Sequence, residues 1–356
     1  MLYQATKIPK KIEYCDFREQ VLNRDESHQQ KGEHVAIIGE PGSGKTALLQ
    51  QIAHWVANNI DQSIPIWVSL ADLRGQDIET YLKYQWLNLI KRKAQREEDL
   101  EDFFRQYETQ LQNGRFRLFL DGLDELQPNP SDCLAEIERQ LEPVKSLVRV
   151  VLTCRLNLWD GSHHALYNFN VYRTSDLSYP EQVEQFIQQW FESYVPDAHV
   201  THAEDLRNAL RNPEKQRIQD LVKNPLRLTL LCLYWYWNDK NELPNTKHEL
   251  YENFIARLYA QKWKIRQHFY LQDEQKEALH LALGELATEA IEKEDIRFQL
   301  RHKLVSNILG KENTVNSLFS LSLELGLLNQ VGVEAKPERQ PLYAFFHPTF
   351  LEYFSA

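Results

Sequence analysis

Cysteine is scarce in this chain of 356 residues, and the few cysteines stand far apart. They are Cys15, Cys133, Cys154 and Cys232, and no two of them form a Cys-x-x-Cys pair. This spacing excludes both a cysteine-based zinc site and a disulfide framework. Scattered thiols are typical of a reducing compartment, so we expect a cytoplasmic protein.

Long apolar runs and an excess of positive charge are also missing. The longest apolar run, residues 226–237, contains Arg227 and is too short to span a bilayer. Residues 1–11 lack the apolar core of a signal peptide. The formal net charge of -10 gives the chain no general basic surface for nucleic acid or anionic lipid. We therefore expect a soluble protein with no membrane partner and no clear nucleic-acid site.

The order of expected strands and helices divides the chain into an α/β part and a helical part. Short apolar runs with the length of buried strands lie at 34–39, 64–70, 115–120, 147–153 and 167–172. Helical patterns lie between several of them, at 48–56, 78–94, 99–112 and 131–141. This alternation indicates a parallel sheet with helices on both faces. After about residue 178 helical periodicity dominates, and a hairpin-like pair at 327–333 and 342–346 precedes a last helix.

Residues 39–46 have the sequence Gly-Glu-Pro-Gly-Ser-Gly-Lys-Thr, a full match to G-x-x-x-x-G-K-[ST]. Gly42 and Gly44 can adopt positive φ, which lets backbone N–H groups converge on phosphate oxygens. Lys45 supplies positive charge to the β- and γ-phosphates, and the Thr46 hydroxyl can bind magnesium. The position between an apolar run and an amphipathic helix favours a phosphate site over a chance glycine-rich turn. The expected nucleotide contacts are Gly39, Glu40, Pro41, Gly42, Ser43, Gly44, Lys45, Thr46 and Ala47.

A second motif lies at 118–126, Leu-Phe-Leu-Asp-Gly-Leu-Asp-Glu-Leu. A strand that ends in Asp121 places a carboxylate at the edge of the sheet where ligands of open α/β sheets bind. We expect Asp121 and Thr46 to hold Mg²⁺. Asp124 and Glu125 follow within one turn, and either could accept a proton from an attacking water, with Glu125 preferred. Alone, the segment is best explained as a polar turn; the phosphate loop favours the functional interpretation of Asp121.

The motifs together resemble the NACHT branch of the STAND signalling ATPases. The resemblance rests on GEPGSGKT at 39–46, LFLDGLDEL at 118–126 and VVLTCR at 150–155. It implies that Arg155, at the end of the next strand, reports on the γ-phosphate, a role that spacing alone does not distinguish from an ordinary surface arginine. It also implies a particular domain order. We expect a P-loop nucleotide-binding domain at 1–178, a helical subdomain at 179–241 and a winged-helix-like domain at 242–356.

Two later residues resemble nucleotide contacts of the same family. Asn224-Pro225-Leu226 opens an apolar helix, with Asn224 as the N-cap and Pro225 in the first turn, and this alone requires no ligand. By the resemblance, Pro225 packs on the adenine. His347 matches a winged-helix histidine that contacts the β-phosphate of ADP in the closed state. Because Pro348 suits a first helical turn, we expect His347 at a helix start, with a neutral ring that donates one hydrogen bond.

The resemblance implies a signalling switch driven by ATP and ADP. ADP would lock a closed monomer, ATP would promote self-association, and slow hydrolysis using Asp121, Glu125 and Lys45 would reset the switch. In a bacterial setting the implied role is conflict signalling or antiviral defence. Effector and sensor domains, usual in the family, are not expected within this chain. Its apolar last residues, 351–356, lead us to expect a core fragment of a longer protein.

Two other functions use the same phosphate loop. A P-loop phosphotransferase would need an acceptor pocket and a lid with catalytic arginines, and the sequence shows no clear lid signature. A scaffold could hold nucleotide without hydrolysing it, which the Asp124-Glu125 pair argues against. Adenine is favoured over guanine because an Asn-Lys-x-Asp type of contact is missing and because of the family resemblance.

Overall fold

The computed structural model describes most of the chain, with gaps. The described residues are 2–4, 10–22, 34–60, 63–73, 76–82, 116–123, 130–142, 148–160, 166, 168–195, 199–237, 242–265, 272–292, 299–312, 317–333 and 340–356. Contacts divide the chain into two compact units. The first comprises Met1–Glu40 and Gly44–Ser175, and the second comprises Pro41–Ser43 and Asp176–Ala356.

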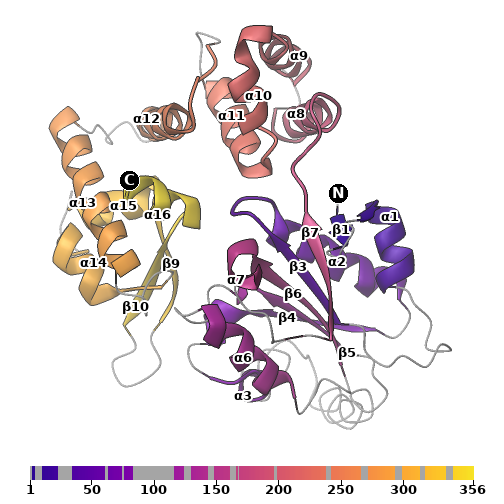
Figure 1. Cartoon of the computed structure of the whole chain (residues 1–356). Helices are drawn as coiled ribbons and strands as arrows, with labels where there is room; N and C mark the ends of the chain where they lie inside the picture. Colours follow the sequence, from indigo (N-terminus) through magenta and orange to yellow (C-terminus); the bar gives the residue numbers. More distant parts are fainter. Residues whose placement is uncertain are drawn as a thin grey trace, which may run out of the picture. The chain divides into compact units, whose positions relative to one another are not determined.

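The first unit is built on a sheet with strand order β2-β1-β7-β3-β6-β5-β4 (Figure 1). Its strands are β1 (Leu2–Gln4), β2 (Lys10–Ile12), β3 (His34–Gly39), β4 (Ile64–Ser69), β5 (Phe116–Asp121), β6 (Arg149–Arg155) and β7 (Phe169–Thr174). The strands from β7 to β4 pair in parallel, which confirms the expected parallel sheet. Their carboxyl ends therefore lie along one edge of the sheet.

One edge of this sheet corrects the sequence-based expectation. β1 pairs antiparallel with both β7 and β2, so the sheet is mixed, not wholly parallel. The expectation was wrong here because strands of three residues are too short to show a recognisable apolar pattern.

Helices cover both faces of the parallel strands, as the sequence predicted. Along β3, Val35 and Ile37 belong to one apolar core, whereas Ala36 and Ile38 belong to another. This alternation follows from the period of two in a strand. The first core includes Ile52 of α2 (Lys45–Asn59) and is also lined by α1 (Tyr14–Phe17). The second core is lined by α3 (Ile78–Tyr81), α6 (Pro130–Leu141) and α7 (Leu156–Asp160) (Figure 1).

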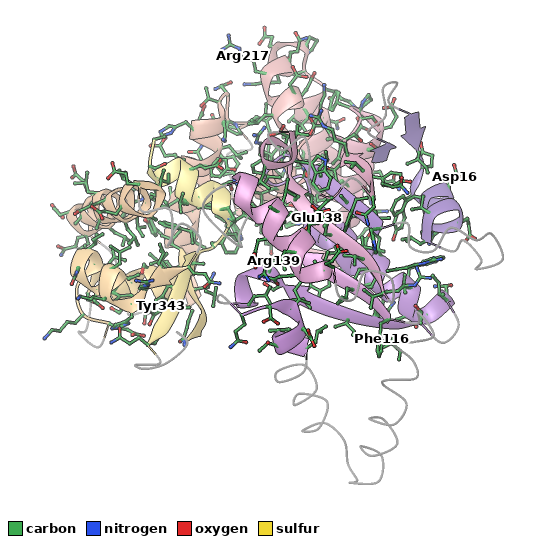
Figure 2. The ribbon with its side chains drawn as sticks, turned by 60° about the horizontal axis from the view of Figure 1, so that its bottom comes forward. Asp16, Phe116, Glu138, Arg139, Arg217 and Tyr343 are labelled. Atoms are coloured by element: carbon green, nitrogen blue, oxygen red, sulfur yellow. The ribbon has the colours of Figure 1, made fainter. Side chains whose placement is uncertain are left out.

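Helix α6 matches the helix expected at 131–141, and its two sides differ in character. Leu134 and Ile137 are buried in the core beside the sheet. The polar side carries Glu138 and Arg139 (Figure 2), and Arg139 forms a 2.6 Å ion pair with Glu136. Arg139 is exposed, so this pair adds little to stability. Of the helices expected at 78–94 and 99–112, only the first turn of one, α3, falls within the described residues.

The second unit is mainly helical. Its helices are α8 (Glu181–Tyr194), α9 (His199–Leu210), α10 (Gln216–Leu221), α11 (Pro225–Trp237), α12 (Lys247–Ile265), α13 (Asp273–Glu292), α14 (His302–Leu309), α15 (Leu318–Leu325) and α16 (Pro348–Phe354). One core cluster extends from α8 to α16, with Trp235 and Tyr251 among its largest buried side chains. No helix in the described ranges is both long and apolar enough to cross a membrane.

A small antiparallel sheet lies within the second unit, in the order β8-β10-β9. Strands β9 (Leu328–Val333) and β10 (Pro341–Phe345) confirm the expected hairpin, which precedes α16. Tyr343 of β10 is buried, and its hydroxyl donates a 3.0 Å hydrogen bond to Glu312 (Figure 2). Strand β8 (Leu300–Arg301) was not expected, because two residues carry no periodicity. The winged-helix assignment and the boundary near 241 remain predictions.

Candidate functional site

The loop at 39–46 connects β3 to α2 through two glycines with left-handed backbone. Gly42 has φ 76° and Gly44 has φ 82°. Side chains other than hydrogen are strained at such angles, which explains glycine at both positions. Gly44 is the N-cap of α2, whose helical residues begin at Lys45. The first N–H groups of a helix have no intrahelical acceptor, so the start of α2 suits an anion.

The Lys45 side chain turns back onto its own loop. Its ammonium donates hydrogen bonds to the carbonyl oxygens of Gly39 and Glu40, each at 3.0 Å. These contacts hold a positive charge beside the segment whose backbone turns at Gly42 and Gly44. The positive charge of Lys45 and the N-terminus of α2 therefore lie on the same short loop. Both features favour the binding of a polyphosphate.

Asp121, at the end of β5, is the acceptor at the centre of a small hydrogen-bond network. Its Oδ1 accepts from the Thr46 hydroxyl at 3.1 Å and from the Thr153 hydroxyl at 2.6 Å. The Thr153 oxygen in turn accepts the N–H of Gly122 at 2.8 Å. The network joins the first turn of α2 to the carboxyl ends of β5 and β6. It brings together Thr46 and Asp121, the two residues expected to hold a metal.

Thr153 is a site residue that the sequence analysis missed. Its side chain is 1% exposed, and its hydroxyl both donates to Asp121 and accepts from the main chain after β5. It therefore fixes the carboxylate and the following turn at once. A threonine inside an apolar run is ordinary for a strand, so no sequence signal separated it from its neighbours.

The order of the strands explains why β6 contributes to this site. β6 lies between β3, which leads into the loop, and β5, which ends in Asp121. Arg155, the last residue of β6, pairs in register with Gly39 and is 9% exposed. The structure thus places Arg155 at the start of the phosphate loop. Asp124 and Glu125 lie outside the described residues.

The oxygen atoms at the carboxyl edge fit a magnesium ion that is bound together with a nucleotide. Magnesium is held by one or two carboxylates plus the phosphates of a substrate. Asp121 supplies a carboxylate and Thr46 a hydroxyl at hydrogen-bond distance from it. Within the described residues, no group of three or more His, Cys, Asp or Glu side chains could hold a metal ion. These donors alone are too few for a closed metal cage.

Pro225 and His347 both lie at the starts of helices in the second unit. Pro225 is the first residue of α11, and the Asn224 side chain accepts the Arg227 N–H at 3.3 Å, which confirms the expected cap. His347 is the N-cap of α16, and its Nδ1 accepts the N–H of Thr349 at 3.2 Å. This bond assigns the ring proton to Nε2. Histidine acts as the cap here through its ring nitrogen.

Replacing Thr153 by valine tests the hydrogen-bond network. Valine has nearly the same shape, but it removes the acceptor of the Gly122 N–H and one of the donors to Asp121, while the Thr46 hydroxyl remains. We expect the free energy of unfolding, measured with urea, to fall by about 1–3 kcal/mol. Thr288→Val is the matched control, because Thr288 is exposed and bonds only its own helix. Equal effects of the two substitutions would contradict the role of Thr153.

A phosphate loop between a strand and a helix, with an acidic residue ending another strand of the same sheet, defines a P-loop α/β domain. Comparison with protein families agrees: residues 33–194 match the family model of the NACHT domain. This segment is therefore similar to NACHT domains, which are P-loop NTPase domains. The match includes the whole loop 39–46, Asp121 and Arg155.

Comparisons with individual proteins add little. No curated protein matches the chain. Among solved structures, a chain of the Drosophila ORC bound to DNA is 15% identical, with 91% of this chain and 89% of that chain covered and a TM-score of 0.34. A chain of closed-state Hsp104 with ATPyS and FITC casein is 19% identical, with 78% of this chain and 46% of that chain covered and a TM-score of 0.38. These TM-scores are too low to support a conclusion about this chain.

Proposed function

We propose that this chain is a switch that binds ATP or ADP with Mg²⁺ at residues 39–46 and hydrolyses ATP slowly. The observation that carries the proposal is the 3.1 Å hydrogen bond between the Thr46 hydroxyl and the Asp121 carboxylate. Two residues far apart in the sequence meet there, one at the end of the glycine-rich loop and the other at the end of β5. A NACHT family match over the same segment supports the proposal.

The residues of the loop have separate roles in this proposal. Backbone N–H groups from Gly42 to Ala47 bind phosphate oxygens, aided by the positive end of α2. Lys45 neutralises charge on the β- and γ-phosphates, and its present carbonyl contacts keep the ammonium within the loop. Thr46 and Asp121 hold Mg²⁺, which neutralises phosphate charge when it is bound. Thr153 keeps the Asp121 carboxylate in place.

Three further residues distinguish the bound nucleotides in the proposed switch. Arg155 responds to the γ-phosphate, from its position in register with Gly39 at the carboxyl edge. Pro225 packs on adenine, and His347 donates to the β-phosphate of ADP. The donor would be Nε2, since the Thr349 N–H occupies Nδ1. A nucleotide shifts a conformational equilibrium only through such differential contacts.

The proposed switch includes a change of assembly and a signalling output, both taken from the similarity to the NACHT family. ADP favours a closed monomer, and ATP favours self-association in the cytoplasm. The output of the switch is conflict or antiviral signalling. The NACHT match over 33–194 supports this role at the level of the family.

Replacing Glu125 by glutamine tests whether the chain is an ATPase. Glutamine keeps the size of the side chain but cannot accept a proton from water. We expect phosphate release in multiple-turnover assays to fall about 100-fold or more, while ATP affinity is retained. Glu138→Gln, on the polar side of α6, is the control and should turn over like the wild type. Unchanged turnover in Glu125→Gln would remove Glu125 from the mechanism and leave Asp124 as the remaining candidate.

A further inference from the structure

The apex of the phosphate loop, residues Pro41–Ser43, contacts the start of α11. Residues Pro41–Ser43 belong to the second unit by their contacts, although the chain on either side of them belongs to the first. The Asn224 side-chain amide donates to the Pro41 carbonyl at 3.1 Å. The backbone N–H of Leu226 donates to the Gly42 carbonyl at 3.2 Å. Two consecutive carbonyl groups of the loop are thus held by one helix start.

These two bonds determine which way the N–H groups of the loop face. In a trans peptide the C=O and N–H bonds point in opposite directions from the same plane. Because the Pro41 and Gly42 carbonyls face α11, the N–H groups of Gly42 and Ser43 face away from it. Phosphate loops bind their ligand through such N–H groups. The start of α11 therefore sets the orientation of two of the expected phosphate donors.

The packing at Gly42 shows how close this approach is. A Cβ atom on Gly42 would lie 2.9 Å from the Asn224 Oδ1 and 2.9 Å from the Leu226 Cβ. Gly44, which also has positive φ, has no such neighbour within 4 Å. Glycine at position 42 is therefore required for two reasons: its φ is positive, and α11 leaves no room for a Cβ atom. The second requirement is specific to this contact.

Asn224 is suited to hold the loop because its amide has both a donor and an acceptor. The Oδ1 accepts the Arg227 N–H and so caps α11, while Nδ2 donates to Pro41. The side chain is buried, at 5% exposure. Aspartate or serine could still cap the helix, but neither could donate to Pro41 with the same geometry. The two roles of Asn224 can therefore be separated by substitution.

We propose that Asn224 is a positioning residue of the phosphate loop, which orients the Gly42 and Ser43 N–H groups for phosphate by holding the carbonyls on the opposite side. The inference rests on the proposed nucleotide site and names a residue that controls its affinity for phosphate. In this proposal Asn224 acts through the Pro41 carbonyl and not through a contact of its own with the nucleotide. The affinity for any nucleotide with a diphosphate, and the affinity for pyrophosphate alone, should therefore depend equally on Asn224.

The test measures binding of ADP and of pyrophosphate to nucleotide-free protein by calorimetry. The variants are Asn224→Asp and Asn224→Ser, which keep the α11 cap and lose the donor to Pro41. We expect both dissociation constants to rise about tenfold in both variants, as for the loss of one well-placed hydrogen bond. Asn212→Asp is the matched control, since Asn212 caps an exposed turn at Glu214 and should bind both ligands like the wild type.

Each alternative outcome has a definite meaning. Wild-type affinity in both Asn224 variants, with binding lost in Lys45→Ala, overturns the inference and leaves the nucleotide site standing. Unchanged binding in Lys45→Ala overturns the nucleotide site and the inference together. Weaker ADP binding with unchanged pyrophosphate binding would show that α11 acts through the base and not through the loop. A loss in Asn224→Asp alone would show an effect of negative charge, and it also overturns the inference.

Discussion

Lys45→Ala is expected to lower the affinity for ATP and ADP by about 100-fold or more, effectively abolishing binding at micromolar nucleotide. The Lys45 ammonium donates to the Gly39 and Glu40 carbonyls, so the chain itself holds it at the loop. Alanine removes the positive charge that opposes the charge of the phosphates. The Gly39 and Glu40 carbonyls would then lie unneutralised beside an anion, which adds to the loss.

The measurement is a calorimetric titration of each protein with ADP and with ATP in the presence of Mg²⁺. Lys276→Ala is the matched control, because Lys276 pairs with Asp273 on α13 and lies outside the proposed site. The control should bind like the wild type, and both variants should have the unfolding midpoint of the wild type. If Lys45→Ala binds ADP as tightly as Lys276→Ala, the loop is not the phosphate site.

Asp121→Asn is expected to remove the contribution of Mg²⁺ to ATP binding and to lower hydrolysis by about 100-fold or more. Asparagine has nearly the same shape and can still accept from Thr46 and Thr153, so the network of three side chains stays largely intact. It lacks the negative charge that a divalent cation requires. The substitution therefore separates metal binding from folding.

The experiment compares ATP affinity with and without Mg²⁺ in the wild type, in Asp121→Asn and in Asp273→Asn. Asp273 has a side chain that is 94% exposed, and its substitution should leave both affinities unchanged. In the wild type Mg²⁺ should tighten ATP binding, and in Asp121→Asn it should not. A variant that keeps the full effect of Mg²⁺ would place the metal elsewhere.

The parts of the fold that the sequence predicted are those where local signals agree. The apolar run before the loop, the glycines of the loop and the helical spacing after it each indicate the same strand, turn and helix. The place of Asp121 in the site was predictable because the carboxyl ends of parallel strands lie at the edge of the sheet where ligands bind. The antiparallel hairpin of β9 and β10 was recognisable for a different reason, because two apolar runs lie close together in the sequence.

The parts that the sequence did not predict depend on contacts between distant residues or on very short strands. β1 and β2 have three residues each and join the sheet by pairing with β7, far along the chain. In the sequence Thr153 cannot be distinguished from other strand residues, because its role depends on the pairing of β5 with β6. Asn224 was recognisable as a helix cap, but its bond to Pro41 spans 183 positions, and no local pattern encodes it.

A crystal structure of the chain with ADP and Mg²⁺ tests the central claim most directly. We predict that the diphosphate accepts hydrogen bonds from N–H groups within residues 39–47, with Mg²⁺ at about 2.1 Å from the Thr46 hydroxyl oxygen and Asp121 facing the same ion. A diphosphate bound away from this loop, or a loop without ligand in crystals grown at saturating ADP, would contradict the account.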